Sequence, residues 1–266
     1  MAEKKKRSQR FYDYSLLFTI VFLTIFGLIM IYSASSYKAQ MDYDGNAAYF
    51  MTRQGTIALA GFVGMIFISK LGYHWYAKVY HLALVVSWVL MIAVSLFGRK
   101  VNGKRRWLGV GPLSFQPTEL VKIVVIVALA ALITKLGKNV DRLAGVVRAA
   151  AICLPLAAIV AANNLSSGII IAGIGFVMLF VASRKKLPYI LCVLGGVLLV
   201  AFAGPIGHAL ESVGILKEYQ LSRINVWLDP EAYPDTGGFQ VLQGLYAIGS
   251  GGLFGKVLGE SIQKLG

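Results

Sequence analysis

The sequence predicts an all-α, polytopic helical membrane protein, and three observations lead to that prediction. Of the 266 residues, 57% are hydrophobic and only 14% are charged, which is too apolar for a soluble domain. Apolar runs that approach the length needed to cross a hydrocarbon layer of roughly 30 Å recur along residues 14–206. The formal net charge of +14 is carried largely by short segments around these runs, where basic residues set topology instead of binding nucleic acid.

Seven membrane spans are expected between the basic tail 1–13 and residue 207. In chain order they are Tyr14–Ser33, Tyr49–Ser69, Tyr80–Phe97, Leu120–Thr134, Ala149–Ala162, Gly168–Ala182 and Leu187–Ile206. Several apolar cores hold only about 15 residues, so some spans must borrow flanking residues or be shielded by their neighbours.

The charges between the spans predict a cytoplasmic N-terminus. In that orientation the inner segments hold fourteen Lys and Arg residues, whereas nine of the twelve carboxylates fall on the outer side. The basic tail leads into a full-length span without a small-residue cleavage site, as in a retained signal anchor.

The basic outer loop, residues 98–119, goes against this sorting. It carries five cations within eight residues, followed at once by Trp107: Arg99, Lys100, Lys104, Arg105 and Arg106. A basic cluster on the outer side is costly to insert, so we expect an anionic partner there, either a lipid headgroup or a lipid-linked phosphate. The alternative is a solvated loop with an interfacial tryptophan.

The helix after this loop begins with polar residues. Pro117 suits a first helical turn, and Glu119 is favoured there by the helix dipole. Lys122 is three residues further on and can pair with Glu119 on one face. Either the pair simply forms a capped, charge-paired start of the helix, or Lys122 faces a polar cavity, as ionisable residues within membranes usually do. Of Asn163 and Asn164, at least one is expected to form a turn.

Residues 207–266 are expected to form a large outer loop. Its apolar positions from Phe239 to Leu253 predict a surface or cavity-lining helix rather than an eighth span, because two Gln residues and a Gly-Ser-Gly-Gly run interrupt them. A long, ordered loop is usually functional. The glycines from Gly249 to Gly255 either cradle phosphate through backbone N–H groups or allow close packing.

These segments resemble the SEDS family of polytopic cell-wall proteins, whose members include FtsW, RodA and SpoVE. The matching pieces, in the family's order, are Ile31–Ser35, Arg105–Leu108, Phe115–Leu120 with Lys122, Leu228–Pro230, Gly238–Gln240, Gln243, Ala247–Leu253 and Ser261–Leu265. The Gln-Lys-Leu end is more similar to the FtsW and SpoVE branch than to RodA. The chain departs from the resemblance at Asn163–Ser167, where many members have an acidic or Gln-Pro-Asp-type motif.

The resemblance implies a peptidoglycan glycosyltransferase that polymerises lipid II at the outer face of the plasma membrane during division and cell-wall synthesis. It also implies a class B penicillin-binding protein and division proteins as partners. The departing undecaprenyl pyrophosphate needs cations, supplied by Arg105 and Arg106, with Glu119 and Lys122 shaping the cavity and Arg223 lining its other side. The full set of substrate-binding candidates is Lys104, Arg105, Arg106, Trp107, Gln116, Glu119, Lys122, Arg223, Gln240 and Ser250.

The resemblance further implies about ten spans and a divalent cation, although the sequence contains no recognisable metal cage and no other cofactor motif. The family's acidic residue regarded as the catalytic base follows the Gln-Lys-Leu motif and would lie beyond Gly266, so no catalytic residue is assigned. We therefore expect residues 1–266 to be one SEDS-type membrane domain, incomplete at its C-terminus. Two alternatives remain: a lipid II flippase, which the few ionisable groups in the spans disfavour, and a non-catalytic division scaffold.

Overall fold

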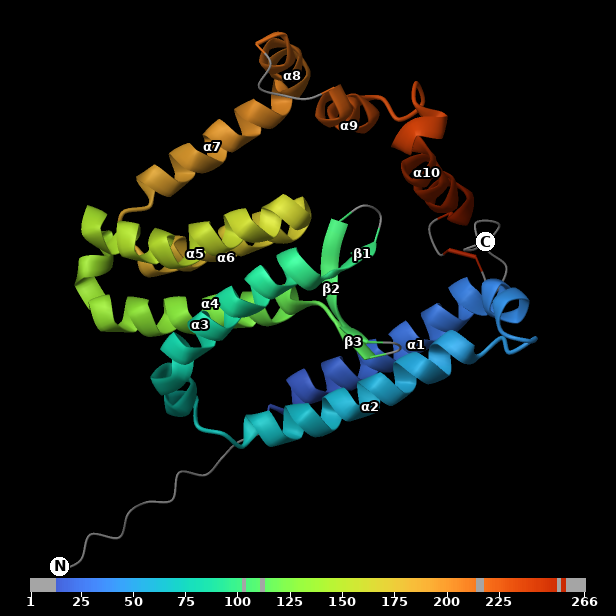
Figure 1. Cartoon of the computed structure of the whole chain (residues 1–266), viewed down its shortest axis with the longest axis horizontal. Helices are drawn as coiled ribbons and strands as arrows, with labels where there is room; N and C mark the ends of the chain where they lie inside the picture. Colours follow the sequence, from blue (N-terminus) through green and yellow to red (C-terminus); the bar gives the residue numbers. More distant parts are fainter. Residues whose placement is uncertain (1–12, 102–103, 111–112, 214–217, 253–254, 257–266) are drawn as a thin grey trace, which may run out of the picture. The chain divides into compact units, whose positions relative to one another are not determined.

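The computed structural model describes residues 13–101, 104–110, 113–213, 218–252 and 255–256 (Figure 1). The chain forms two compact units: unit 1 combines Met1–Lys70 with Phe202–Gly266, and unit 2 is Leu71–Ala201. Most of the basic tail and the predicted motif Ser261–Leu265 lie outside the described residues.

Unit 1 contains two long helices that pack against each other and a set of shorter ones. The long helices are α1 (Tyr14–Asp42) and α2 (Tyr49–Ser69), and the shorter elements are α8 (Ala203–Ser212), α9 (Glu218–Leu228), η2 (Pro234–Gly238) and α10 (Phe239–Gly251). The Asp13 carboxylate caps α1 by accepting from the Leu16 N–H at 3.0 Å. The helix predicted to begin at Phe239 is confirmed as α10, which ends at Gly251, and Leu253 lies outside the described residues.

Unit 2 is a bundle of membrane-length helices with a small sheet. Its elements are α3 (Tyr73–Phe97), β1 (Arg99–Val101), β2 (Lys104–Val110), β3 (Leu113–Phe115), α4 (Pro117–Leu136), η1 (Gly137–Asp141), α5 (Leu143–Asn163), α6 (Leu165–Ala182) and α7 (Leu187–Ala201). Helix α4 packs against α3, α5 and α6, and fully buried side chains such as Met91, Val125, Leu156 and Ile171 form the core between these helices.

Helices α5 and α6 approach each other closely because glycines of α6 face α5. A Cβ atom on Gly168 would lie 2.5 Å from the Cβ of Ala161, and one on Gly175 would lie 2.6 Å from the Sγ of Cys153. Small residues of this kind let membrane helices pack backbone to backbone. This close contact fixes the turn between α5 and α6, which contains Asn163 and Asn164.

The three strands form an antiparallel sheet in the order β1-β2-β3, and β2 contacts the ends of α3 and α4. Lys100 pairs with Arg105 and Leu108 with Phe115, and the register shifts between Arg99 and Lys100. This sheet is not among the elements predicted from the sequence. Its outer strands contain three residues each, too short for an alternating apolar pattern to be recognised.

The all-α, polytopic fold is confirmed. Among the described residues, six helices are long and apolar enough to cross a membrane, or seven if α7 and α8 are taken together as one span. The bounds of α2 coincide with the predicted span, whereas α1 continues to Asp42 and α3 begins already at Tyr73. Helical hydrogen bonding thus continues beyond the apolar runs, which mark only the hydrocarbon-embedded part of each helix.

Candidate functional site

The polar residues of unit 2 gather where the sheet meets four helix ends. We define the sheet end of unit 2 as the last turns of α3 and α5, the first turns of α4 and α6, and the three strands. At this end α3 and α5 present C-terminal carbonyls that lack partners within their own helices. These carbonyls also carry the negative end of each helix dipole.

Arg105 binds the end of α3. One of its terminal guanidinium nitrogens donates to the Ser95 carbonyl at 2.9 Å and also to the Leu96 carbonyl. Both acceptors lie in the last turn of α3. A cation at a helix C-terminus satisfies orphan carbonyls and is stabilised by the dipole.

Lys104 and Arg106 bind the end of α5. The Arg106 Nε donates to the Asn163 carbonyl at 3.0 Å, and the Lys104 Nζ donates to the Ala162 carbonyl at 3.3 Å. Successive strand residues point to opposite faces, which explains why Arg105, between these two, reaches α3 instead. The alternation of β2 therefore distributes three adjacent cations over two helix ends.

A side-chain hydrogen bond also joins α3 to α5, the two helices that β2 already connects. The Asn163 Nδ2 donates to the Ser95 Oγ at 3.2 Å, so that α3 and α5 are joined directly as well as through β2. We call Ser95, Arg105, Arg106 and Asn163 the arginine clamp. Ser95 and Ala162 were not among the predicted site residues, because their backbone carbonyls are the acceptors and a sequence carries no signal for that role.

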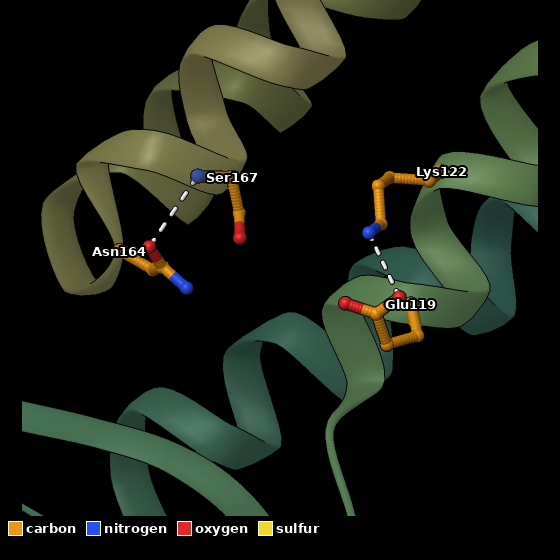
Figure 2. A network of polar contacts seen from close by, with 4 residues as sticks. All are labelled: Glu119, Lys122, Asn164 and Ser167. Atoms are coloured by element: carbon orange, nitrogen blue, oxygen red, sulfur yellow. Dashed lines mark hydrogen bonds and ion pairs between the residues drawn. The ribbon is translucent and has the colours of Figure 1, made fainter. Parts of the chain in front are cut away.

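Asn164 forms the turn that was expected of at least one of the two asparagines. It ends α5 and begins α6 with an extended backbone, and its Oδ1 accepts from the Ser167 N–H at 3.3 Å (Figure 2). An asparagine at this position satisfies one of the free N–H groups of the first helical turn. Asn163 and Asn164 thus have separate roles: one binds α3 and the sheet, and the other caps α6.

The predicted pair of Glu119 and Lys122 is confirmed. The Lys122 Nζ lies 2.8 Å from the Glu119 Oε2, and the side chains are 25% and 62% exposed. Figure 2 shows this pair at the start of α4 together with the Asn164–Ser167 cap on α6, a helix that packs against α4. Exposed pairs three or four residues apart contribute only about 0.3–0.5 kcal/mol, so stability alone does not account for a lysine embedded at this end of the bundle.

The remaining five predicted site residues differ in their surroundings. Trp107 on β2 is exposed, and Gln116 precedes α4 in a partly buried position. Arg223 on α9 and Gln240 and Ser250 on α10 are exposed residues of unit 1, and the Ser250 hydroxyl donates to the Ala247 carbonyl at 3.4 Å. The structure thus brings Lys104, Arg105 and Arg106 together with the start of α4 and leaves the three unit 1 residues as separate predictions.

The sheet end does not provide a ligand set for the divalent cation that the resemblance implies. Glu119 is the one carboxylate in the described part of this end, and it is paired with Lys122. No group of three or more His, Cys, Asp or Glu side chains among the described residues is placed to hold a metal ion. Hard divalent cations require several oxygen ligands, so we assign no role to a metal.

Membrane-length helices whose ends are tied to a basic sheet define an integral, polytopic membrane protein with a cationic site at one end of the bundle. Residues 14–266 match the family model FTSW_RODA_SPOVE, described as "Cell cycle protein". The chain belongs to this family.

Two relatives from Bacillus subtilis (strain 168) are similar over most of the chain. Stage V sporulation protein E is 35% identical over 92% of this chain and 65% of its own length. Probable peptidoglycan glycosyltransferase FtsW is 36% identical over 98% of this chain and 66% of its own length. The chain therefore spans about two thirds of the length of these curated relatives.

Solved structures have the same fold. One is a chain described by the words "Structural coordination of polymerization and crosslinking by a peptidoglycan synthase complex", with a TM-score of 0.68, 27% identity, and coverage of 91% of this chain and 66% of that one. The rod shape determining protein RodA of Thermus thermophilus matches with a TM-score of 0.60 and 22% identity over 94% of this chain and 88% of its own. The RodA likeness is evidence for the fold alone.

Proposed function

We propose that this chain belongs to a peptidoglycan glycosyltransferase that polymerises lipid II during cell division and cell-wall synthesis. Family membership and the name of the FtsW relative support this proposal. The observation that carries it is the sheet end of unit 2, where helix-end carbonyls accept from Lys104, Arg105 and Arg106 and where the Glu119–Lys122 pair lies at the start of α4.

The chemistry of the reaction requires fixed cations. When the acceptor sugar hydroxyl attacks, the bond to the undecaprenyl pyrophosphate breaks and negative charge develops on the departing phosphate oxygens. Donors that are already oriented stabilise that charge without reorganising during the reaction. A guanidinium has five N–H donors, and the contacts of Arg106 described above use its Nε, so the other donors provide capacity for phosphate oxygens.

Lys122 provides a further cation, on helix α4 instead of on strand β2. Its side chain is three-quarters buried and its ammonium group is held by Glu119. A phosphate oxygen that approaches this ammonium can replace or share the carboxylate, which makes Lys122 a binding group rather than a structural one. We assign no general base to the described residues.

The location and partners of the reaction belong to the same proposal. The sorting of charges in the sequence supports a plasma-membrane protein whose sheet end faces the outside of the cell. The name of the similar peptidoglycan synthase complex supports a synthase partner, and we propose a class B penicillin-binding protein for that role, together with division proteins.

The test is a lipid II polymerisation assay on the protein purified from the membranes in which it is made, with its partner. We expect Arg106→Ala to abolish glycan polymer, because the variant removes a fixed cation and one bond of the arginine clamp. Lys38→Ala, which alters an exposed lysine of α1, is the matched control and should leave the polymer unchanged. Normal polymer from Arg106→Ala, or movement of lipid II across the bilayer without any polymer, would contradict the proposal.

A further inference from the structure

The loop end of unit 2, opposite the sheet, consists of the end of α4, η1, the start of α5 and the turn 183–186 between α6 and α7 (Figure 1). A carboxylate connects its two loops. The Asp141 Oδ1 accepts from the Ser183 hydroxyl at 2.6 Å and from the Arg184 N–H at 2.9 Å, and the Ser183 Oγ accepts from the Lys185 N–H at 3.1 Å. Ser183 is 5% exposed and Asp141 is partly buried, and their hydrogen bonds hold both loops as one surface.

That surface is basic, and its charge is not neutralised. Six cations on it are exposed: Lys135, Lys138, Arg142, Arg148, Arg184 and Lys185. Asp141 is the only carboxylate in this part of unit 2, and its hydrogen bonds come from an uncharged hydroxyl and a backbone N–H. Across the described residues, no cation of this surface lies within ion-pair distance of a carboxylate.

The connection brings specific cations next to one another. Arg142 directly follows Asp141, while Arg184 and Lys185 belong to the turn that binds Asp141. Lys186 has a different role, because its Nζ donates to the Phe180 and Val181 carbonyls at the end of α6 and lies 4.5 Å from the centre of the Phe180 ring. Charges that only set membrane topology need to be numerous on one side, but they do not need to be held together across two loops.

We propose that Arg142, Arg184 and Lys185 form a binding site for the headgroups of anionic phospholipids. The turn 183–186 joins two apolar helices directly, which places it at the level of the headgroups. Trp75 is 54% exposed near the start of α3, a helix antiparallel to α4, and exposed aromatic rings of this kind gather at the membrane interface. Because the two loops are already held together, less conformational entropy is lost when the cations bind a phosphodiester group.

The proposal is tested by titrating the whole protein in mild detergent with phosphatidylglycerol or phosphatidylcholine and following single bound lipids by native mass spectrometry. We expect tighter binding of phosphatidylglycerol. The double variant Arg142→Gln/Lys185→Gln should weaken that binding roughly 25-fold, since each basic residue near a lipid surface contributes about fivefold, and added salt should weaken it as well. Phosphatidylcholine binding should not change.

The matched control is Lys38→Gln/Arg53→Gln, which removes one lysine and one arginine from exposed positions of unit 1 and should retain phosphatidylglycerol binding. Equal binding of the two lipids by the unaltered protein would overturn the proposal. So would equal losses in the test and control variants, because the effect would then follow total charge rather than this site. Unaltered chromatographic and circular dichroism profiles exclude misfolding as the cause of a loss.

Discussion

At the sheet end of unit 2, Lys104, Arg105 and Arg106 donate to backbone carbonyls of α3 and α5. At the loop end, the Asp141 carboxylate receives hydrogen bonds from Ser183 and Arg184, and the cations around it remain exposed. The two ends belong to the same bundle, and both are rich in lysine and arginine. They differ in which charged groups form hydrogen bonds within the protein: a set of cations at one end and an anion at the other.

This difference shows that the role of a basic cluster depends on the acceptors within its reach. A strand such as β2 extends its side chains to both faces, so adjacent cations reach two helix C-termini at once. The turn 183–186 has one carboxylate nearby, Asp141, which accepts from a hydroxyl and a backbone N–H, and the Phe180 and Val181 carbonyls accept from Lys186. Cations without an internal acceptor are available for ligands from outside.

After the loss of polymer expected for Arg106→Ala, the next largest effect is expected from Lys122→Met in the polymerisation assay. The variant keeps the apolar stem but removes the ammonium that we assign to phosphate binding. We expect the rate of polymerisation to fall by about 10²–10³-fold, as for the loss of one preorganised electrostatic contact. Lys122→Arg, which keeps the charge, should recover part of the rate, whereas a rate close to normal in Lys122→Met would remove this residue from the site.

Arg106→Gln tests the arginine clamp through stability. The variant loses the charge-assisted bond to the Asn163 carbonyl, and at a partly buried position we expect the protein to lose about 1–2 kcal/mol of unfolding free energy. Hydrogen exchange should quicken at the Asn164 amide, which donates to Val160 at the end of α5. Arg184→Gln, which changes an exposed side chain at the loop end, is the control; equal changes in both variants would mean that the clamp has no specific role.

The helical part of the sheet end follows from the sequence, but its strands and its internal contacts do not. The start of α4 at Pro117 and the Glu119–Lys122 pair are local features, separated by a few residues, and helix rules predict them. The bond from Arg106 to Asn163 joins residues 57 positions apart. It depends on how closely α5 approaches β2, and that approach is set by packing.

The loop end gives the same lesson. The sequence shows a lysine- and arginine-rich turn after α6 and a carboxylate before α5. Charge sorting explains the basic turn as a topology signal but gives the carboxylate no role. Only the fold brings Asp141 to Ser183, 42 residues away. The break between α7 and α8, within the predicted span Leu187–Ile206, was likewise not visible as an interruption of the apolar run.

The two asparagines offer a smaller and more selective test. Asn164→Ala removes the cap of α6 and should lower the unfolding free energy by about 1 kcal/mol, with faster exchange at the Ser167 amide. Asn163→Ala instead removes the side-chain bond to the Ser95 hydroxyl. It should leave the Ser167 amide unaffected, because the Asn164 cap remains and the backbone carbonyl of residue 163 still accepts from Arg106. Asn164→Asp should preserve the cap. Faster exchange at Ser167 in both alanine variants would show that the two roles are not separate.

Ser183→Ala is expected to have the smallest effect. It removes one of the two hydrogen bonds to Asp141 and the acceptor for the Lys185 N–H, but it leaves the bond from the Arg184 N–H and every cation in place. Hydrogen exchange at Arg184 and Lys185 should therefore become several-fold faster, and phosphatidylglycerol binding should weaken less than in Arg142→Gln/Lys185→Gln. Ser183→Thr keeps the hydroxyl and should behave as the unaltered protein. Lipid binding that is unchanged despite faster exchange would mean that the charges alone recruit the lipid and that fixing the loops adds nothing.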